Sequence, residues 1–444
     1  MKKNYLILIL LITIATISTA QTQNDDDLLI KAQINGKCGY INKNGKWVIK
    51  PDFDIIGPFY ENGLANVKLN DKWGFIDKTG KMKIEPIFES AHPFTENMAS
   101  VKYNGKWKYI DTTGKEVFQQ HFDDAMEFYG GIAPVKINNK WGFINKKGKM
   151  IMKPILDNFY VASKDLICII INGKYGFMNT KGKIVIYPQF DDTNGFSNNG
   201  LASVEFNGKW GCINVKGKMI IKPQFEYIYD FSDNNLAVIV LNDKYGYINS
   251  TGEMVIKPQF EEVQPFAQNG LARIKLNNKF GFIDTIGNFI IEPIFEKAQS
   301  FYNKNITTVK LNGKWGVIDK KGVMIVAPEF DFAINFSNNN IGTINLDKKW
   351  GLIDSTGKII IEPTYDLINN FSNEEMAQVE INEQWGFIDK NGKIVIEPQF
   401  DDIYEYFNVI FVKKNKKWGI IDKLGNYLAE PQFDQVVEIF SIPF

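Results

Sequence analysis

Residues 64–86 read LANVKLNDKWGFIDKTGKMKIEP, and this stretch decides the fold. Residues 64–69 alternate in polarity as a half-buried strand does, and Asn70-Asp71 follows where two residues have to reverse the chain. A second strand is expected over residues 72–77, and the third is expected to end at Pro86, which lacks the N–H for pairing. The stretch therefore predicts a three-stranded antiparallel meander, and the segment after the proline can add a short fourth strand.

The meander is one unit of an internal repeat of about 35 residues. Each unit has an aromatic slot that is usually followed by glycine, a second glycine seven residues after the slot and a proline thirteen residues after it. Lys108 and Gln120 are the exceptions to the first glycine and to the proline, both in the third unit. The twelve slots hold Cys38, Trp73, Trp107, Trp141, Tyr175, Trp210, Tyr245, Phe280, Trp315, Trp350, Trp385 and Trp418.

The two-residue turn fixes the register of the hairpin, so Lys68 should lie opposite Trp73 and Val67 opposite Gly74. In this register, both faces of each small sheet carry apolar side chains. Sheets stacked face to face bury both faces, and Gly74 is expected to let the next sheet approach closely. The predicted fold is all-β, with twelve tandem antiparallel β-meander repeats stacked as a propeller-like or an open superhelical array. Closed propellers typically have about four to eight blades, so two closed rings in tandem or one open array are the alternatives.

The motif KWGFID-x-x-GK-x-x-I-x-P-x-F(D/E), intact over residues 72–89, resembles the bacterial WG-repeat family, which is also named after its KWG triplet. The resemblance covers residues 30–444. It implies an exported or surface-associated β-repeat protein and implies neither an enzymatic activity nor a defined ligand.

The first twenty residues have the layout of a secretory signal: Lys2 and Lys3, then an apolar run, then small residues that end at Ala20. Cleavage after Ala20 is expected, followed by a polar leader over residues 21–29 and the repeat array over residues 30–444. Without a second long apolar stretch, we expect no transmembrane segment in the mature chain. The protein is therefore expected in the periplasm or on the exterior of the cell.

Composition argues against a nucleic-acid partner. The 444 residues carry 51 Lys+Arg against 51 Asp+Glu, and Arg273 is the only arginine. Proteins that bind nucleic acids usually present a basic stripe with arginines that contact phosphates and base edges.

An acid stands three residues after the proline slot in every unit, as Glu89 does after Pro86, and a lysine precedes nearly every aromatic slot. A row of carboxylates could bind cations such as Ca²⁺, but each unit supplies only one acid, whereas a calcium site needs about six to eight oxygens. The favoured interpretation is structural: each acid accepts hydrogen bonds from a turn or pairs with a repeat lysine.

The aromatic row has two interpretations, either packing or contact with sugar rings. Substitution of the slot by phenylalanine, tyrosine or cysteine favours packing. Trp47, Tyr404 and Tyr406 lie outside the slot and are the candidate binding residues. The residues expected to build the repeat are Trp73, Gly74, Gly80, Pro86, Trp141, Trp210, Trp315, Trp350, Trp385 and Trp418.

Metal, cofactor and catalytic constellations are not expected. His92 and His121 are the only histidines, and neither has a second ligand at a metal-site spacing. Cys38, Cys168 and Cys212 occupy different repeat positions, so their disulfide state stays open.

Two functional hypotheses follow. The first is a noncatalytic exported repeat protein that binds protein or glycan partners or serves as their scaffold. The alternative is a carbohydrate-active enzyme that uses two carboxylates in a groove of the array. Such acids are expected outside the repeat consensus, for instance Glu405 or Glu127.

Overall fold

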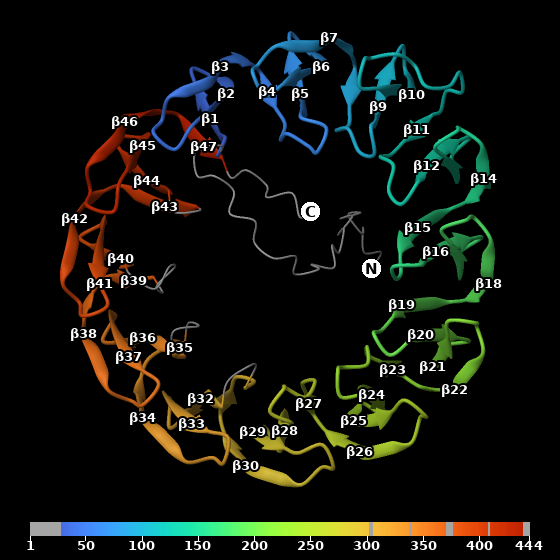
Figure 1. Cartoon of the computed structure of the whole chain (residues 1–444). Helices are drawn as coiled ribbons and strands as arrows, with labels where there is room; N and C mark the ends of the chain where they lie inside the picture. Colours follow the sequence, from blue (N-terminus) through green and yellow to red (C-terminus); the bar gives the residue numbers. More distant parts are fainter. Residues whose placement is uncertain (1–27, 302–304, 337–339, 370–375, 407–408, 438–444) are drawn as a thin grey trace. The chain divides into compact units, whose positions relative to one another are not determined.

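The computed structural model describes residues 28–301, 305–336, 340–369, 376–406 and 409–437, and their regular structure is entirely β-strand (Figure 1). The chain divides into two compact units, one of residues 1–188 with 404–444 and the other of residues 189–403. Within the described ranges, no helix is long and apolar enough to cross a membrane. The predicted all-β fold of twelve small antiparallel sheets is confirmed.

The sheets are numbered here in the order of their hairpins along the chain. Sheets 1 to 6 contain, in order, β1 (Ile30–Ile34), β2 (Lys37–Ile41), β3 (Trp47–Phe53) and β47 (Gln435–Val437); β4 (Ile55–Ile56), β5 (Leu64–Leu69), β6 (Lys72–Asp77) and β7 (Met82–Phe88); β8 (Ser90–Ala91), β9 (Met98–Tyr103) and β10 (Lys106–Asp111); β11 (Asp124–Ala125), β12 (Ile132–Ile137), β13 (Lys140–Asn145) and β14 (Met150–Leu156); β15 (Asn158–Val161), β16 (Leu166–Ile171), β17 (Lys174–Asn179) and β18 (Ile184–Phe190); β19 (Asp192–Phe196), β20 (Leu201–Phe206), β21 (Lys209–Asn214) and β22 (Met219–Phe225).

Sheets 7 to 12 contain, in order, β23 (Tyr227–Ile228), β24 (Leu236–Leu241), β25 (Lys244–Asn249) and β26 (Met254–Phe260); β27 (Glu262–Val263), β28 (Ala272–Leu276), β29 (Lys279–Ile283) and β30 (Phe289–Phe295); β31 (Lys297–Ala298), β32 (Ile306–Leu311), β33 (Lys314–Asp319) and β34 (Met324–Phe330); β35 (Asn335–Phe336), β36 (Ile341–Leu346), β37 (Lys349–Asp354) and β38 (Ile359–Tyr365); β39 (Leu367–Ile368), β40 (Met376–Ile381), β41 (Gln384–Asp389) and β42 (Ile394–Phe400); β43 (Asp402–Tyr406), β44 (Val409–Lys414), β45 (Lys417–Ile421) and β46 (Tyr427–Phe433).

The short strand of each sheet comes from the repeat before it. In sheet 2, for example, the order is β4-β5-β6-β7, and β4 follows directly on the proline segment of the first repeat. The segment after the proline therefore does supply a fourth strand, as predicted, but the strand joins the hairpin of the following repeat.

The last short strand completes the first sheet. β47 pairs with β1, with Ala32 opposite Val436, and sheet 1 has the order β3-β2-β1-β47 (Figure 1). The first and last repeats therefore share one sheet, which the propeller-like alternative requires. Two separate six-repeat arrays would each need a closing strand of their own, whereas the strand from the middle of the chain, β23, pairs with the next hairpin along the chain, β24.

The hairpin register follows the prediction from the turn. Lys68 lies opposite Trp73 and Val67 opposite Gly74. Asn70 and Asp71 have φ of 50° and 62°, as a two-residue turn with two left-handed positions requires. Gly80, at φ 82°, takes the left-handed position of the second turn.

The prediction that the third strand ends at the proline is wrong. β7 runs through Pro86 to Phe88, which lies opposite Trp73, while Ile84 lies opposite Phe75. Three residues of β7 thus stand opposite the single Gly74, which is a β-bulge larger than the usual two residues against one. Because β7 is an edge strand, the absent N–H of Pro86 leaves no neighbouring strand without a partner.

The reason expected for Gly74 is also wrong. A Cβ on Gly74 would lie 2.5 Å from the carbonyl oxygen of Ile84 and 2.8 Å from the nitrogen of Pro86, both in the third strand of its own sheet. At the other ten glycines of this slot, the same added atom would lie 2.4 to 2.7 Å from a backbone oxygen. The glycine therefore gives room to the bulge rather than to the next sheet.

Sheet 3 shows what happens without that glycine. Lys108 replaces the glycine, Gln120 replaces the proline, and the sheet has only three strands in the order β10-β9-β8. The third strand is reduced to the isolated bridges Trp107 to Phe122 and Ile110 to Glu116. The regular bulged strand is therefore absent where both the glycine and the proline are replaced.

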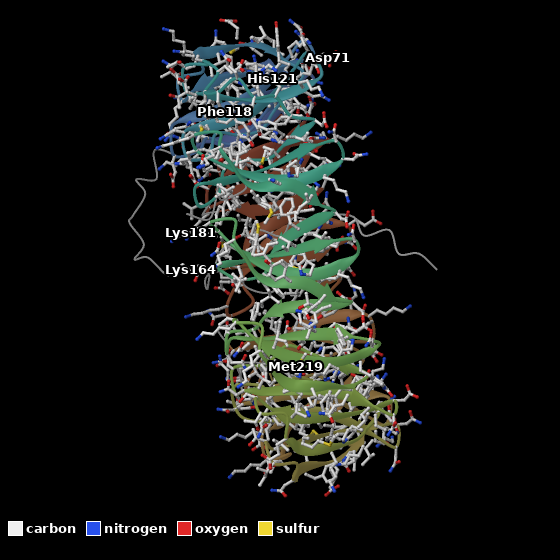
Figure 2. All side chains as sticks on the ribbon, turned by 90° about the vertical axis from the view of Figure 1, so that its right-hand side faces the viewer. Asp71, Phe118, His121, Lys164, Lys181 and Met219 are labelled. Atoms are coloured by element: carbon white, nitrogen blue, oxygen red, sulfur yellow. The ribbon has the colours of Figure 1, made fainter. Side chains whose placement is uncertain are left out.

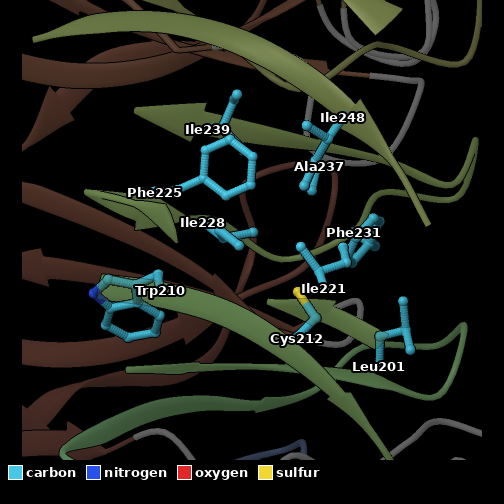
Figure 3. Packing of buried hydrophobic residues seen from close by; sticks show 10 residues of the cluster. All are labelled: Leu201, Trp210, Cys212, Ile221, Phe225, Ile228, Phe231, Ala237, Ile239 and Ile248. Atoms are coloured by element: carbon cyan, nitrogen blue, oxygen red, sulfur yellow. The ribbon is translucent and has the colours of Figure 1, made fainter. Parts of the chain in front are cut away.

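Within each unit, neighbouring sheets bury apolar faces against one another, as the alternation predicts. Figure 3 shows one such cluster, in which Trp210 and Cys212 of sheet 6 pack against Ile228, Ala237 and Ile239 of sheet 7. Aromatic residues after the short strands add to these contacts. For example, the rings of Phe282 and Phe301, from successive sheets, lie 4.8 Å apart.

We predict that Gly246→Ala lowers the free energy of unfolding by about 1–3 kcal/mol, because the new methyl group has to displace backbone. Its Cβ would lie 2.5 Å from the oxygen of Ile256 and 2.7 Å from the nitrogen of Pro258. Urea unfolding measures the change. Gly313→Asn is the matched control, because this turn glycine has open space around it and the equivalent Asn278 already adopts φ 61°. Equal stability of the two variants would contradict the bulge explanation.

We also predict that a chain ending at Asp434 unfolds at a lower temperature than a chain ending at Val437. The shorter chain loses β47 and exposes the edge of β1, and such an edge promotes association between molecules. Thermal unfolding and light scattering measure both effects. The chain that ends at Val437 is the control, since it keeps the pairing. If both chains behave alike, β47 does not hold the first and last repeats together.

Candidate functional site

The repeat lysine and the repeat acid form a clamp between neighbouring sheets. The Lys314 Nζ of sheet 9 lies 2.5 Å from Asp331 Oδ1, and the other carboxylate oxygen of Asp331 accepts a hydrogen bond from the backbone N–H of Asp347 at 2.9 Å. Asp347 belongs to the hairpin turn of sheet 10. The same arrangement holds Lys349 and Asp366 at 2.5 Å, with a 2.8 Å hydrogen bond from Asn382 N–H.

The clamp also joins the first and last repeats. Asp434 pairs with Lys417 and accepts the backbone N–H of Asn35 at 2.6 Å. Glutamates in the acid slot bind turn N–H groups in the same way, as Glu226 does with Asn242 at 3.0 Å. The structural interpretation of the acid row is confirmed, and these carboxylate oxygens serve the fold.

A second set of carboxylates closes the turn before the third strand. Asp77 Oδ1 accepts the backbone N–H of Thr79 at 2.9 Å and of Lys81 at 3.1 Å. The hydrogen bond from the Thr79 hydroxyl is the main cause that lowers the pKa of Asp77 to about 2. Equivalent turn bonds also lower the pKa values of Asp354 and Asp389.

The rings in the aromatic slots lie against the sheets and are largely covered. Trp141 and Trp210 are buried, and Trp73, Trp315, Trp350, Trp385 and Trp418 are half-buried. A lysine from the opposite strand covers several of these rings. The ammonium group of Lys136 lies 5.4 Å from the Trp141 ring, and that of Lys413 lies 5.5 Å from the Trp418 ring. Such cation–π contacts close a ring face that would otherwise meet solvent.

The three candidate contact residues pack against one hydrophobic cluster, formed by sheets 12 and 1. The Trp47 ring meets Phe433 edge-on at 5.7 Å, and Tyr404 lies 6.2 Å from Phe411. Tyr406 borders the same cluster, and all three side chains are half-buried. The structure thus brings them to one cluster, where much of each ring is used in packing.

The two carboxylates of the enzymatic alternative lie on different sheets. Glu405 is in β43 of sheet 12, and Glu127 follows β11 of sheet 4, and both are half-buried. Burial and, next, the Glu127 carboxylate raise the pKa of Tyr109, whose hydroxyl donates to the carbonyl of Met126 at 2.7 Å.

Both histidines lie in or beside sheet 3. His92 stacks on Trp107 at 4.7 Å, and its Nδ1 lies 2.8 Å from the Ser100 hydroxyl. His121 Nε2 lies 2.9 Å from Glu116, which also pairs with Lys108 at 3.2 Å. His121 and Phe118 lie in the same part of the first unit (Figure 2). In the parts of the chain that the structure describes, no group of three His, Cys, Asp or Glu residues could hold a metal ion.

The three cysteines are buried. Burial raises the pKa of Cys212 to about 12, so this side chain behaves as an apolar core residue. Cys38 sits in an aromatic slot and Cys212 in the Phe75 position, as the sequence pattern indicated.

The segments after the repeat acids carry residues that the sequence analysis did not single out. Tyr227 packs on Trp210 at 4.6 Å and donates its hydroxyl to Asn194 Oδ1 at 2.9 Å, while Tyr229 meets Tyr227 edge-on. In sheet 10, Phe332 stacks on Trp350. An aromatic residue directly after the acid is the sequence signal that could have found Tyr227 and Phe332, because this position varies among the repeats.

The lowered pKa values predict a loss of stability in acid. A carboxyl whose pKa is lower in the folded state stabilises the protein above its unfolded value, about 4, and this contribution is lost as the pH falls toward the folded value. We therefore expect urea unfolding to need less denaturant at pH ~3 than at pH ~5.

Asp77→Asn tests this contribution, because an asparagine closes the same turn at Asn145 without a titrating carboxyl. The variant should lose less stability than the parent over that pH interval. Parallel pH curves for parent and variant would show that the Asp77 carboxyl is not involved.

Comparisons with known proteins agree with the repeat pattern. The family described as WG containing repeat matches residues 39–73, 73–107, 109–141, 141–175, 175–210, 210–245, 245–280, 280–315, 315–350, 350–385, 385–418 and 418–441. No curated protein matches the chain.

Solved structures resemble the chain only distantly. A crystal structure of the eukaryotic initiation factor is 13% identical, with a TM-score of 0.28 over 74% of this chain and 94% of that one. An extracellular domain assigned to a hybrid two component system of B. thetaiotaomicron is 10% identical, with a TM-score of 0.26 over 93% and 71%. Kluyveromyces lactis Hsv2p is 9% identical, with a TM-score of 0.26 over 60% and 94%. Likeness at this level supports no argument about function.

The family match extends over nearly the whole described chain, and its twelve units equal the sheets in number, each unit running from about one aromatic slot to the next. The chain therefore belongs to the family of proteins built from the WG containing repeat.

Proposed function

We propose that the protein is a noncatalytic, exported binding or scaffold module for protein or glycan partners. The proposal rests on one observation: most constant positions of each repeat serve the fold, whereas one position varies in its chemistry. The lysine, the aromatic residue, the glycine, the proline and the acid are engaged in the clamp, the bulge and the core. The position directly after the acid is free to vary, and it holds Ile55, Asp192, Tyr227, Lys297 and Phe332 in different repeats.

This variable position lies in or next to the short strand at one edge of each sheet. A constant framework that presents a row of chemically different side chains is typical of repeat proteins that bind macromolecules over an extended surface. Export is part of the proposal and rests on residues 1–20, which lie outside the described residues. Signal cleavage after Ala20 would leave Gln21 as the first residue.

Site-specific photo-crosslinking in intact cells tests the proposed role. A photoreactive residue in place of Lys297, which is exposed on short strand β31, should capture a discrete partner. The control replaces Tyr187, which is 72% exposed on β18, the edge strand opposite the short strand of its sheet. A photoreactive residue there should capture little. The recovered protein should begin at Gln21.

Identical adducts from both positions, or no adduct from any short-strand position, would argue against a binding role of this edge. Recovery of the uncleaved chain from the cytoplasm would argue against export.

A further inference from the structure

Sheet 10 departs from its neighbours at the short strand. In sheets 7, 8 and 9 the short strand begins directly after the acid, and Tyr227, Glu262 and Lys297 each pair with the second-last residue of the next strand, as Glu262 does with Lys275. In sheet 10 the acid is Asp331, but β35 begins only at Asn335, which pairs with Thr343. The pairing is therefore displaced along β36, and Phe332 and Ala333 lie outside the ladder.

The displaced segment places an exposed aromatic ring over the tryptophan of the same sheet. Phe332 is 56% exposed and lies nearly parallel to Trp350, with ring centroids 5.8 Å apart and an interplanar angle of 20°. By contrast, most aromatic pairs in the described chain are tilted or edge-on, as in the core pair Phe282 and Phe301. Parallel stacking keeps one flat face of Phe332 available at the surface.

Beside this pair lies a polar group without a partner. Asn345 stands directly opposite Trp350 on the neighbouring strand and is only 1% exposed. No described residue donates a hydrogen bond to Asn345 Oδ1. Most repeats carry a lysine or an apolar residue here, as at Lys275 and Lys310 of sheets 8 and 9. A buried amide oxygen without a donor is unfavourable, and a ligand hydroxyl or a bridging water molecule can supply the donor.

We propose that Phe332, Trp350 and Asn345 form a binding site for a neutral carbohydrate. The aromatic pair stacks against the C–H face of a pyranose ring, and a sugar hydroxyl, directly or through one water molecule, donates to Asn345 Oδ1. The inference rests on the proposed function, since it names the ligand class for one repeat of the binding edge.

The charges around the site favour a neutral ligand. Lys314 is engaged by Asp331 and Lys349 by Asp366, each at 2.5 Å. Neither ammonium group is therefore available to hold a phosphate or a carboxylate. A flat aromatic surface with an uncharged hydrogen-bond acceptor at its margin suits a ring that has an apolar face and hydroxyl groups.

Isothermal titration of the purified protein with cellohexaose, maltohexaose and chitohexaose tests the site. We expect one of the three to bind, and Phe332→Ala to weaken that binding about tenfold or more through the lost stacking surface. Asn345→Lys should weaken it similarly, because it restores the lysine of sheets 8 and 9 at this position. This second variant matters if Phe332→Ala disturbs folding, since the lysine is native to the repeat.

Phe289→Ala is the matched control, because Phe289 is also an exposed phenylalanine of the same unit. It lies on β30, the edge strand opposite the short strand of its sheet. Unchanged binding by both site variants, or weakening by the control as well, would overturn the site. The absence of binding to all three sugars would overturn the carbohydrate assignment, whereas the proposed binding role is judged separately by the crosslinks from Lys297. A protein captured in cells only when Phe332 is intact would also overturn the carbohydrate assignment and identify the occupant of the site as a protein.

Discussion

Each sheet of this protein is built from two repeats, because the short strand after one proline pairs with the hairpin of the next repeat and the last short strand pairs with the hairpin of the first. No repeat can therefore complete a sheet alone. The clamp acts across the same junction, as Asp331 shows by holding Lys314 of one sheet and the turn of the next. Covalent continuity, strand pairing and charge thus all link neighbours, which is the nearest-neighbour coupling on which repeat proteins depend for stability.

The bulge in the third strand explains why the most recognisable pair of residues in the repeat is tryptophan followed by glycine. The bulged backbone crosses over the glycine, and the tryptophan pairs with the phenylalanine beyond the proline. A bulge and a proline on an edge strand also hinder pairing with foreign strands, which protects this otherwise open edge in every sheet except sheet 3. Sheet 3 supports this explanation from within the chain, since Lys108 and Gln120 depart together there.

Much of the local structure could be predicted from the sequence because it depends on neighbouring residues. The Lys68 to Trp73 register follows from the turn, and the turn bond of the repeat acid follows from its fixed spacing. The role of Gly74 could not be predicted, because the contact depends on a bulge whose residues are ten or more positions away. The pairing of β47 with β1 could not be predicted from the repeat pattern, because it joins the first and last repeats of the array.

The site in sheet 10 was beyond sequence reasoning for a different reason. Its Phe332 is an aromatic residue in a variable position, and only the displaced pairing of β35 places it over Trp350. The burial of Asn345 is likewise a tertiary effect, since the equivalent residues of sheets 8 and 9 are lysines. A small change of strand register can thus give one repeat a chemistry that its neighbours lack, without a change in the motif that builds the sheet.

The pairing of β47 with β1 makes the order of the repeats cyclic in space. Since Gln33 and Gln435 face each other in one sheet, the two ends of the array are spatial neighbours. A cyclic order of the same repeats, with the old ends joined and new ends opened in another hairpin turn, would preserve every strand pairing that the structure describes.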